Sequence, residues 1–168
     1  MPNWCDNKAI VVFKSAKAAD EFIKACAEEL VLPVPGTLLD LTEPKNLFQH
    51  YLPMPADVKE QWYNWCISNW GTKWAPEITA VSRTGDKQVE IEFQTAWSPP
   101  LEWFETCGMR HNWQWQLGYI EPGVEVAGHA RGDKNGITLH DEYTPGPDFE
   151  AIAQDFGMSL EDYDDSDS

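Results

Sequence analysis

The segment Gln88–Trp97, QVEIEFQTAW, decides the fold class of this chain. Every second position from 89 to 95 is apolar or Thr, and the positions between them hold Glu90, Glu92 and Gln94. This alternation predicts a β-strand in a sheet with one buried face and one face open to solvent. Carboxylates on a solvated face keep ordinary acidities, so we assign Glu90 and Glu92 no catalytic role.

The residues around this segment predict the rest of the sheet. A partner strand is expected at 78–83, and the turn residues 84–87, TGDK, would join the two strands in a hairpin. Alternation or short apolar runs predict four further strands, at 7–14, 112–120, 124–131 and 137–141. We expect Gln114 and Gln116 to lie on the same open face, which becomes the candidate partner-binding surface.

Two helices are expected before the hairpin. Apolar residues at helical spacing predict one at 16–30, which Ser15 can cap. The next carries a stripe of aromatic residues and starts at a capping pattern formed by Asp57 and Glu60. Gly71 suits a left-handed C-terminal cap for this second helix.

Two more helices follow the hairpin. Ser98 and the two prolines after it predict a helix at 99–109, with Ser98 as its cap. A short helix is expected at 148–156. The two helices 16–30 and 99–109 should cover the apolar face of the sheet.

The order of elements is β-α-(insertion, α)-β-β-α-β, followed by a hairpin. This order predicts an α+β fold with a split βαβ plan: an antiparallel sheet with helices on one face, an insertion after the first helix and a C-terminal hairpin extension. We expect a single domain at 1–157. A proline-rich insertion would occupy 31–56, and an acidic disordered tail 158–168.

The charge of the chain restricts its partners. The 168 residues include 12 Lys and Arg against 28 Asp and Glu, a net charge of -16. No Lys or Arg follows Lys134. Phosphate would be repelled, so no direct nucleic-acid binding is expected, whereas a basic protein surface would be attracted. The same charge is also typical of a solubilising surface. No stretch is apolar enough to span a membrane, and no signal peptide is visible.

The metal-binding residue types are scattered. We expect the cysteines to be free thiols packed as small hydrophobic groups: Cys5, Cys26, Cys66 and Cys107. The final hairpin would let His129 and His140 approach each other beside Asp141, but this spacing matches no established metal motif. We therefore expect no metal site and no cofactor.

Four short motifs are the most distinctive feature of the chain: MPNWC at 1–5, LPMP at 52–55, WGTKW at 70–74 and TAWSPP at 95–100. With them the chain resembles the YubB-like proteins of phages and plasmids, over roughly residues 1–131. The resemblance implies a ferredoxin-like domain, an origin in a mobile genetic element and a place in the bacterial cytoplasm. It implies no particular reaction.

Tryptophans mark the candidate ligand site. We expect Trp4, Trp70, Trp74 and Trp97 to form one cluster that joins three of the motifs. A pocket for a nucleobase, a sugar ring or an anchor side chain of a partner could be lined by Trp62, Trp65, Trp70, Trp74 and Trp97. Lys73 could contact an anion there, and the simpler expectation is that it rests on Trp70 or Trp74. The other interpretation is that these rings belong to the core, in which case Trp97→Ala would cost about 3–5 kcal/mol.

These observations favour a non-enzymatic accessory protein that binds a host or competing-element protein with a basic surface. One form of this function is an anti-defence factor that acts as an acidic mimic of nucleic acid. The alternative is a small-molecule binder, or sponge, for a nucleotide-like ligand. The sequence contains no GxxxxGK[ST], GxGxxG or GxSxG motif, so the enzymes that rely on these motifs are poorly supported.

Overall fold

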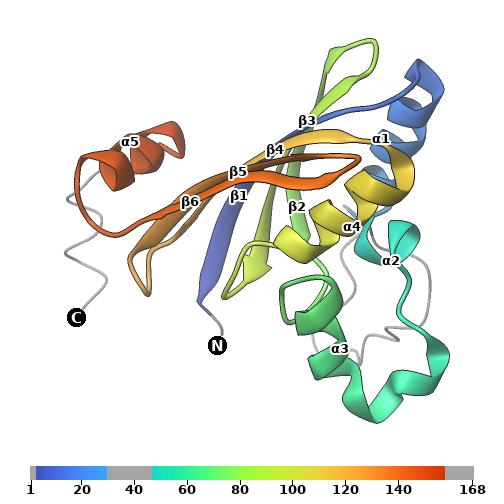
Figure 1. Cartoon of the computed structure of the whole chain (residues 1–168), viewed down its shortest axis with the longest axis horizontal. Coiled ribbons are helices and arrows are strands. Elements are labelled where there is room, and N and C mark those ends of the chain that lie inside the picture. The colour runs from blue at the N-terminus through green and yellow to red at the C-terminus, as the bar shows by residue number, and fades with distance from the viewer. Residues whose placement is uncertain (1–2, 30–46, 158–168) are drawn as a thin grey trace.

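A six-stranded antiparallel sheet forms the centre of the computed structural model, which describes residues 3–29 and 47–157 (Figure 1). The strands lie in the order β2-β3-β1-β4-β5-β6. Their bounds are β1 Trp4–Val12, β2 Glu77–Gly85, β3 Gln88–Ala96, β4 Gln114–Glu121, β5 Val126–Asp133 and β6 Gly136–Tyr143. The predicted α+β class and all six predicted strands are confirmed.

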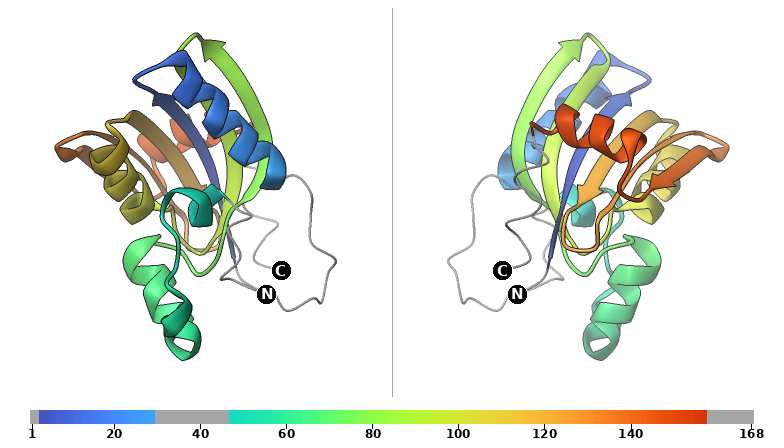
Figure 2. Two further views of the ribbon diagram at one scale, coloured as in Figure 1. Left: turned by 90° about the vertical axis from the view of Figure 1, so that its right-hand side faces the viewer. Right: turned by 90° about the vertical axis from the view of Figure 1, so that its left-hand side faces the viewer.

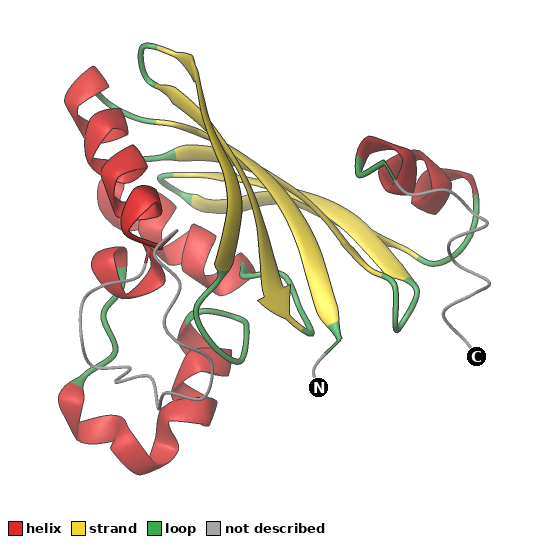
Figure 3. Cartoon of the chain, turned by 180° about the vertical axis from the view of Figure 1, so that it is seen from behind, coloured by secondary structure: helices red, strands yellow, loops and turns green. Residues whose placement is uncertain are grey.

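The helices lie between the strands in sequence. They are α1 Ala16–Glu29, α2 Leu47–Tyr51, the 3-10 helix η1 Ala56–Gln61, α3 Trp62–Asn69, α4 Leu101–His111 and α5 Pro147–Asp155. Helices α1 and α4 cover one face of the sheet, as predicted, whereas α5 lies against the opposite face (Figures 2 and 3). The expectation of helices on one face is therefore wrong for α5.

The position of α5 follows from two buried apolar residues that lie side by side on the open face of the sheet. Ile120 in β4 and Ala127 in β5 pair across the two strands, and both are fully buried. They form a small second core with Phe149 and Ala153 of α5. Apolar area on a sheet face must be removed from water, and α5 does this where the alternation of β4 ends.

The main core lies between the sheet and the opposite helices. Register places Ala9 of β1 between Ile91 of β3 and Leu117 of β4, and all three are buried. The described part of the predicted insertion belongs to this core: the Phe48 ring of α2 stacks on Trp103 of α4 at 4.6 Å. The expected tail 158–168, and the insertion up to residue 46, lie outside the described residues.

Two of the predicted helix caps are wrong, and proline explains one of them. The Ser15 hydroxyl accepts a hydrogen bond from the Ala18 amide at 3.1 Å, as expected. Ser98 does not cap α4, because Pro99 and Pro100 have no N–H to be capped, and the helix begins at Leu101. Asp57 makes no capping bond either, since the chain there is a 3-10 helix that follows Pro55.

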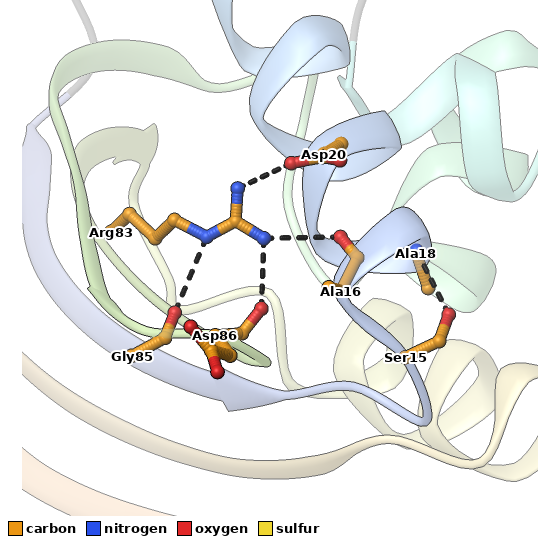
Figure 4. Close-up of polar contacts among 7 residues, drawn as sticks. All are labelled: Ser15, Ala16, Ala18, Asp20, Arg83, Gly85 and Asp86. Carbon is orange, nitrogen blue, oxygen red and sulfur yellow. Dashed lines mark hydrogen bonds and ion pairs between the residues drawn. The ribbon is translucent and has the colours of Figure 1, made fainter.

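Arg83 fastens the β2 edge of the sheet to α1 (Figure 4). Its guanidinium forms an ion pair with Asp20 and donates to the Ala16 carbonyl at 3.1 Å. It also donates to the carbonyls of Gly85 and Asp86, at 3.3 and 2.8 Å. One side chain thus holds the β2–β3 hairpin in place and blocks part of an exposed strand edge.

Candidate functional site

Three of the distinctive motifs meet at one end of the sheet. The Trp97 amide donates to the Asn3 carbonyl at 2.8 Å, which joins the N-terminal segment to the TAWSPP turn. The Thr72 hydroxyl donates to the Ala96 carbonyl at 2.9 Å, and the Ser98 hydroxyl donates to the Gly71 carbonyl at 2.6 Å. These bonds make the three segments parts of a single structural site, as the sequence predicted.

Trp97 occupies an unusual backbone position within this site. Its φ is 71°, and the Ser98 amide donates to the Ala96 carbonyl at 2.9 Å, so Trp97 is the central residue of a three-residue γ-turn. Positive φ strains a residue with a side chain by roughly 1–3 kcal/mol. Trp97 is nevertheless 47% exposed, so burial of its side chain is not what maintains this conformation.

Two of the four predicted tryptophans, Trp70 and Trp97, differ in their exposure to solvent. Trp70 is fully buried, and its indole N–H donates to the Leu52 carbonyl at 3.0 Å. It belongs to the core and lines no exposed surface. Trp97 lies on the surface, so the expectation that Trp97→Ala removes a buried ring is wrong.

Lys73 joins the exposed aromatic residues. Its Nζ lies 4.8 Å from the ring centroid of Trp74, 5.0 Å from that of Trp97 and 6.0 Å from that of Tyr63. Trp4 packs edge-on against Trp74 with centroids 6.3 Å apart. We call Tyr63, Trp74 and Trp97 the aromatic cage. The contact of Lys73 with Trp74 was predicted, but those with Tyr63 and Trp97 depend on tertiary structure.

The predicted partner-binding residues all lie on the open face of the sheet, opposite α1 and α4. The Glu92 side chain is 45% exposed and lies 3.8 Å from the Lys8 ammonium. Gln94 donates to the Asp6 carboxylate at 2.7 Å. Register places Glu90 and Gln116 on either side of Ile10. The open face therefore presents carboxylates and amides in neighbouring strands, and Gln114 lies exposed at its margin.

Two hollows are found on this open face. One, of about 500 Å³, lies between the sheet and the end of α5, and its lining includes Asp6, Lys8, Glu92 and Phe156. The other, of about 320 Å³, is lined mainly by Ile10, Val12, Gln88, Gln114, Gln116 and Arg131. The sequence did not reveal the first hollow, because α5 was not expected on this face.

Lys8 attaches the end of α5 to the sheet. Its ammonium donates to the Asp155 carbonyl and lies 4.9 Å from the ring centroid of Phe156. A cation at the C-terminal end of a helix complements the partial negative charge there. Lys8 therefore helps to form the wall of the larger hollow.

The two histidines of the final hairpin lie on opposite faces of the sheet. His129 pairs in register with Asp141, and Ala130 with His140, so the expected approach of His129 to His140 is wrong. His140 Nε2 and a Glu142 carboxylate oxygen each lie 2.7 Å from the Tyr119 hydroxyl. Burial and the neighbouring Glu142 raise the pKa of Tyr119, so this group remains a neutral structural phenol.

The four cysteines are buried, and no disulfide joins them within the described residues, as predicted. Burial raises the pKa of Cys66 to about 11, which makes this thiol a poor nucleophile at neutral pH. Within the described residues, no group of three or more His, Cys, Asp and Glu side chains could hold a metal ion.

A membrane-spanning helix, one both long and apolar enough to cross a bilayer, is not found among the described residues.

Comparison with known proteins reveals similarity in structure only. No family model matches the sequence, and no curated protein matches it. The structure is similar to the crystal structure of a protein api92 from Yersinia pseudotuberculosis, assigned to the family model DUF1281, with a TM-score of 0.62. The match covers 88% of this chain and all of that chain at 9% identity. A likeness at this identity supports the mixed α/β fold alone.

Proposed function

We propose that this chain is a non-enzymatic accessory protein of a phage or plasmid, and that it binds a basic surface of a host or competing-element protein in the bacterial cytoplasm. The four sequence motifs support this origin. We also assign the domain to the ferredoxin-like class. The strand order β2-β3-β1-β4, with α1 and α4 on one face, supports this assignment.

The open face carries the proposal. Glu90 and Glu92 lie between Gln88 and Gln94 on the open face of β3, and both hollows border this surface. Carboxylates beside hydrogen-bonding amides suit lysine and arginine side chains, which need both charge and acceptors. The net charge of -16 would also speed association with a basic partner.

For an anti-defence role, we propose that the acidic chain acts as a mimic of nucleic acid. A basic surface that evolved to bind phosphate would also attract this acidic chain. Binding should then weaken as salt increases, and duplex DNA should compete.

The test compares variants with equal changes in charge, using a ten-residue oligolysine peptide as the probe. Glu90→Gln with Glu92→Gln should weaken binding at 50 mM salt by roughly two- to thirtyfold, from the ~0.2–1 kcal/mol of each exposed ion pair. The control, Asp57→Asn with Glu60→Gln, removes the same charge from the 3-10 helix. Equal weakening in both variants would mean that only net charge matters, and would contradict an open-face site.

Exposure of Trp97 beside Lys73 favours the alternative, a binder of a nucleotide-like small molecule. An indole ring can stack on a base while an ammonium contacts a phosphate. Trp70 is excluded from such a site by its burial. Titration with a nucleoside monophosphate tests this alternative, since binding should require both Lys73 and Trp97.

A further inference from the structure

We infer that the aromatic cage is a binding site for an alkylammonium group of a partner, and that Lys73 is its internal occupant. This inference goes beyond the proposed function, because it concerns a surface at the end of the sheet and not its open face. The external ligand would be a lysine side chain, with a methylated ammonium as the best fit.

The geometry of the cage is suited to a cation. Ring centroids lie 4.8, 5.0 and 6.0 Å from the Lys73 ammonium, within the ~6 Å range over which a cation is attracted to an aromatic face. The rings come from three elements: Tyr63 from α3, Trp74 from the loop after it, and Trp97 from the γ-turn. Three ring faces around one ammonium form the arrangement that recognises quaternary ammonium ligands.

Lys73 is held in the cage in a way that permits exchange. Within residues 3–29 and 47–157, no carboxylate lies within 4.0 Å of its ammonium, so the described contacts of this group are with ring faces. A primary ammonium is strongly hydrated, whereas a methylated one loses less hydration on entering an aromatic site. An external methylated ammonium can therefore replace Lys73.

The cage should persist when Lys73 leaves it. The backbone at Trp97 is positioned by hydrogen bonds to Asn3 and between Ala96 and Ser98, and Thr72 also bonds to the Ala96 carbonyl. None of these bonds involves the Lys73 side chain. A strained residue that its surroundings hold in an exposed position is a frequent feature of binding sites.

The charge around the cage selects cations over anions. A Cβ placed on Gly71 would lie 1.9 Å from a Glu102 carboxylate oxygen, so this carboxylate lies directly against the WGTKW segment. The chain as a whole carries -16. A phosphate would meet repulsion here, and an ammonium would be attracted.

The experiment uses tetramethylammonium chloride as the probe, with sodium chloride at equal ionic strength as the reference. Indole N–H resonances of Trp74 and Trp97 report binding by NMR. Lys73→Ala should bind the probe about five- to tenfold more tightly than the wild-type protein, because an internal occupant lowers the apparent affinity by the fraction of empty cages. Lys73→Ala combined with Trp97→Ala should lose this binding.

Further variants keep the test decisive. Lys87→Ala removes an exposed lysine from the β2–β3 turn and should bind as the wild type does. If Lys73→Ala does not fold, Lys73→Gln, which keeps a long side chain without charge, should bind about threefold more tightly than wild type by the same reasoning. The open-face variant Glu90→Gln with Glu92→Gln should bind tetramethylammonium as the wild type does. A negative result for the cage is therefore distinct from a negative result for the open-face site of the proposed function.

Two results would overturn the inference. The first is a folded variant without the Lys73 charge that binds tetramethylammonium no better than wild type. The second is binding of adenosine monophosphate by the wild type that disappears in Lys73→Ala. Lys73 would then be an anion-binding group, and the site would belong to the nucleotide alternative.

Discussion

At the scale of single residues, Trp103 and Trp97 differ in backbone conformation and in the burial of their rings. Trp103 lies in a helix and its ring is fully buried, whereas Trp97 has positive φ and a half-exposed ring. Deleting the first ring would leave a cavity. Deleting the second would leave solvent in its place, while the strain of the γ-turn would remain.

Substitutions at these two positions should therefore differ in their effect on stability. We expect Trp103→Ala to lower the free energy of unfolding by about 3–5 kcal/mol. Trp97→Ala should lower it by about 1 kcal/mol, in the range of a half-exposed ring contact. Trp97→Gly should be more stable than Trp97→Ala by about 1 kcal/mol, because glycine accepts positive φ without strain. Urea unfolding measures all three, and a cost of 3 kcal/mol or more for Trp97→Ala would contradict an exposed ring.

Cys66 provides a prediction about alkaline pH. Burial raises its pKa to about 11, above the ordinary thiol value, so the folded protein keeps this proton when the unfolded chain has lost it. The free energy of unfolding keeps its full value below the pKa of this thiol in the unfolded chain, and it falls as pH rises from there toward 11. Between pH 9 and 11, Cys66→Ala should therefore lose stability less steeply than wild type. Identical slopes in chemical unfolding would contradict this.

Residue-scale features were the least predictable from sequence. Alternation correctly placed Glu90, Glu92 and Gln116 on the open face, because side-chain direction follows directly from strand periodicity. The conformation of Trp97 depends instead on bonds to Asn3 and to residues around the WGTKW segment. Those partners are distant in sequence, so no local pattern could indicate that this tryptophan is exposed.

At the scale of elements, α5 is held to the sheet by a small core of its own. Phe149 is almost fully buried against Ile120 and Ala127, separately from the main core. Loss of this contact should release α5 and leave the rest of the sheet intact, because stability is distributed in local units.

Phe149→Ala tests this separation. We expect amide hydrogen exchange in residues 147–155 to accelerate strongly, since deleting a buried Phe costs about 3–5 kcal/mol. Exchange in β1 and β3 should stay near the wild-type rate. Gln154→Ala, at an exposed position of the same helix, is the matched control. Uniform acceleration throughout the sheet would show that α5 is part of the global folding unit.

Element positions were predictable where periodicity was clear, whereas the start of α4 was not. All six strands were expected near their observed places. Ser98 was misassigned because its hydroxyl bonds to the Gly71 carbonyl, a tertiary partner, while the prolines after it offer no amide. The side of the sheet that α5 covers was readable in principle, since Ile120 interrupts the row of polar residues in β4.

At the scale of the whole molecule, the net charge of -16 acts on stability as well as on partners. Like charges in a compact chain repel each other, and unfolding relieves this repulsion. Salt screens the repulsion over a Debye length of about 10 Å at 0.1 M.

Added salt should therefore stabilise the protein. Between 20 and 500 mM NaCl, we expect Tm to rise by roughly 2–4 °C, which corresponds to about 1 kcal/mol for a domain of this size. Potassium chloride should act equally, because screening depends on ionic strength and not on the cation. A Tm that is constant or falls with salt would show that favourable ion pairs outweigh repulsion.

The central place of β1 has a consequence for the time at which the sheet can form. This strand precedes every other strand in the chain, yet its two neighbours are β3 and β4. During synthesis the backbone groups of β1 have no strand to pair with until residues 88–96 have been made. The second partner strand, β4, is available to β1 only after residues 114–121 have been made. Chain growth proceeds at about 5–20 residues per second. For several seconds, therefore, the apolar strand AIVV depends on the nascent chain around it, or on cellular chaperones, to avoid incorrect pairing.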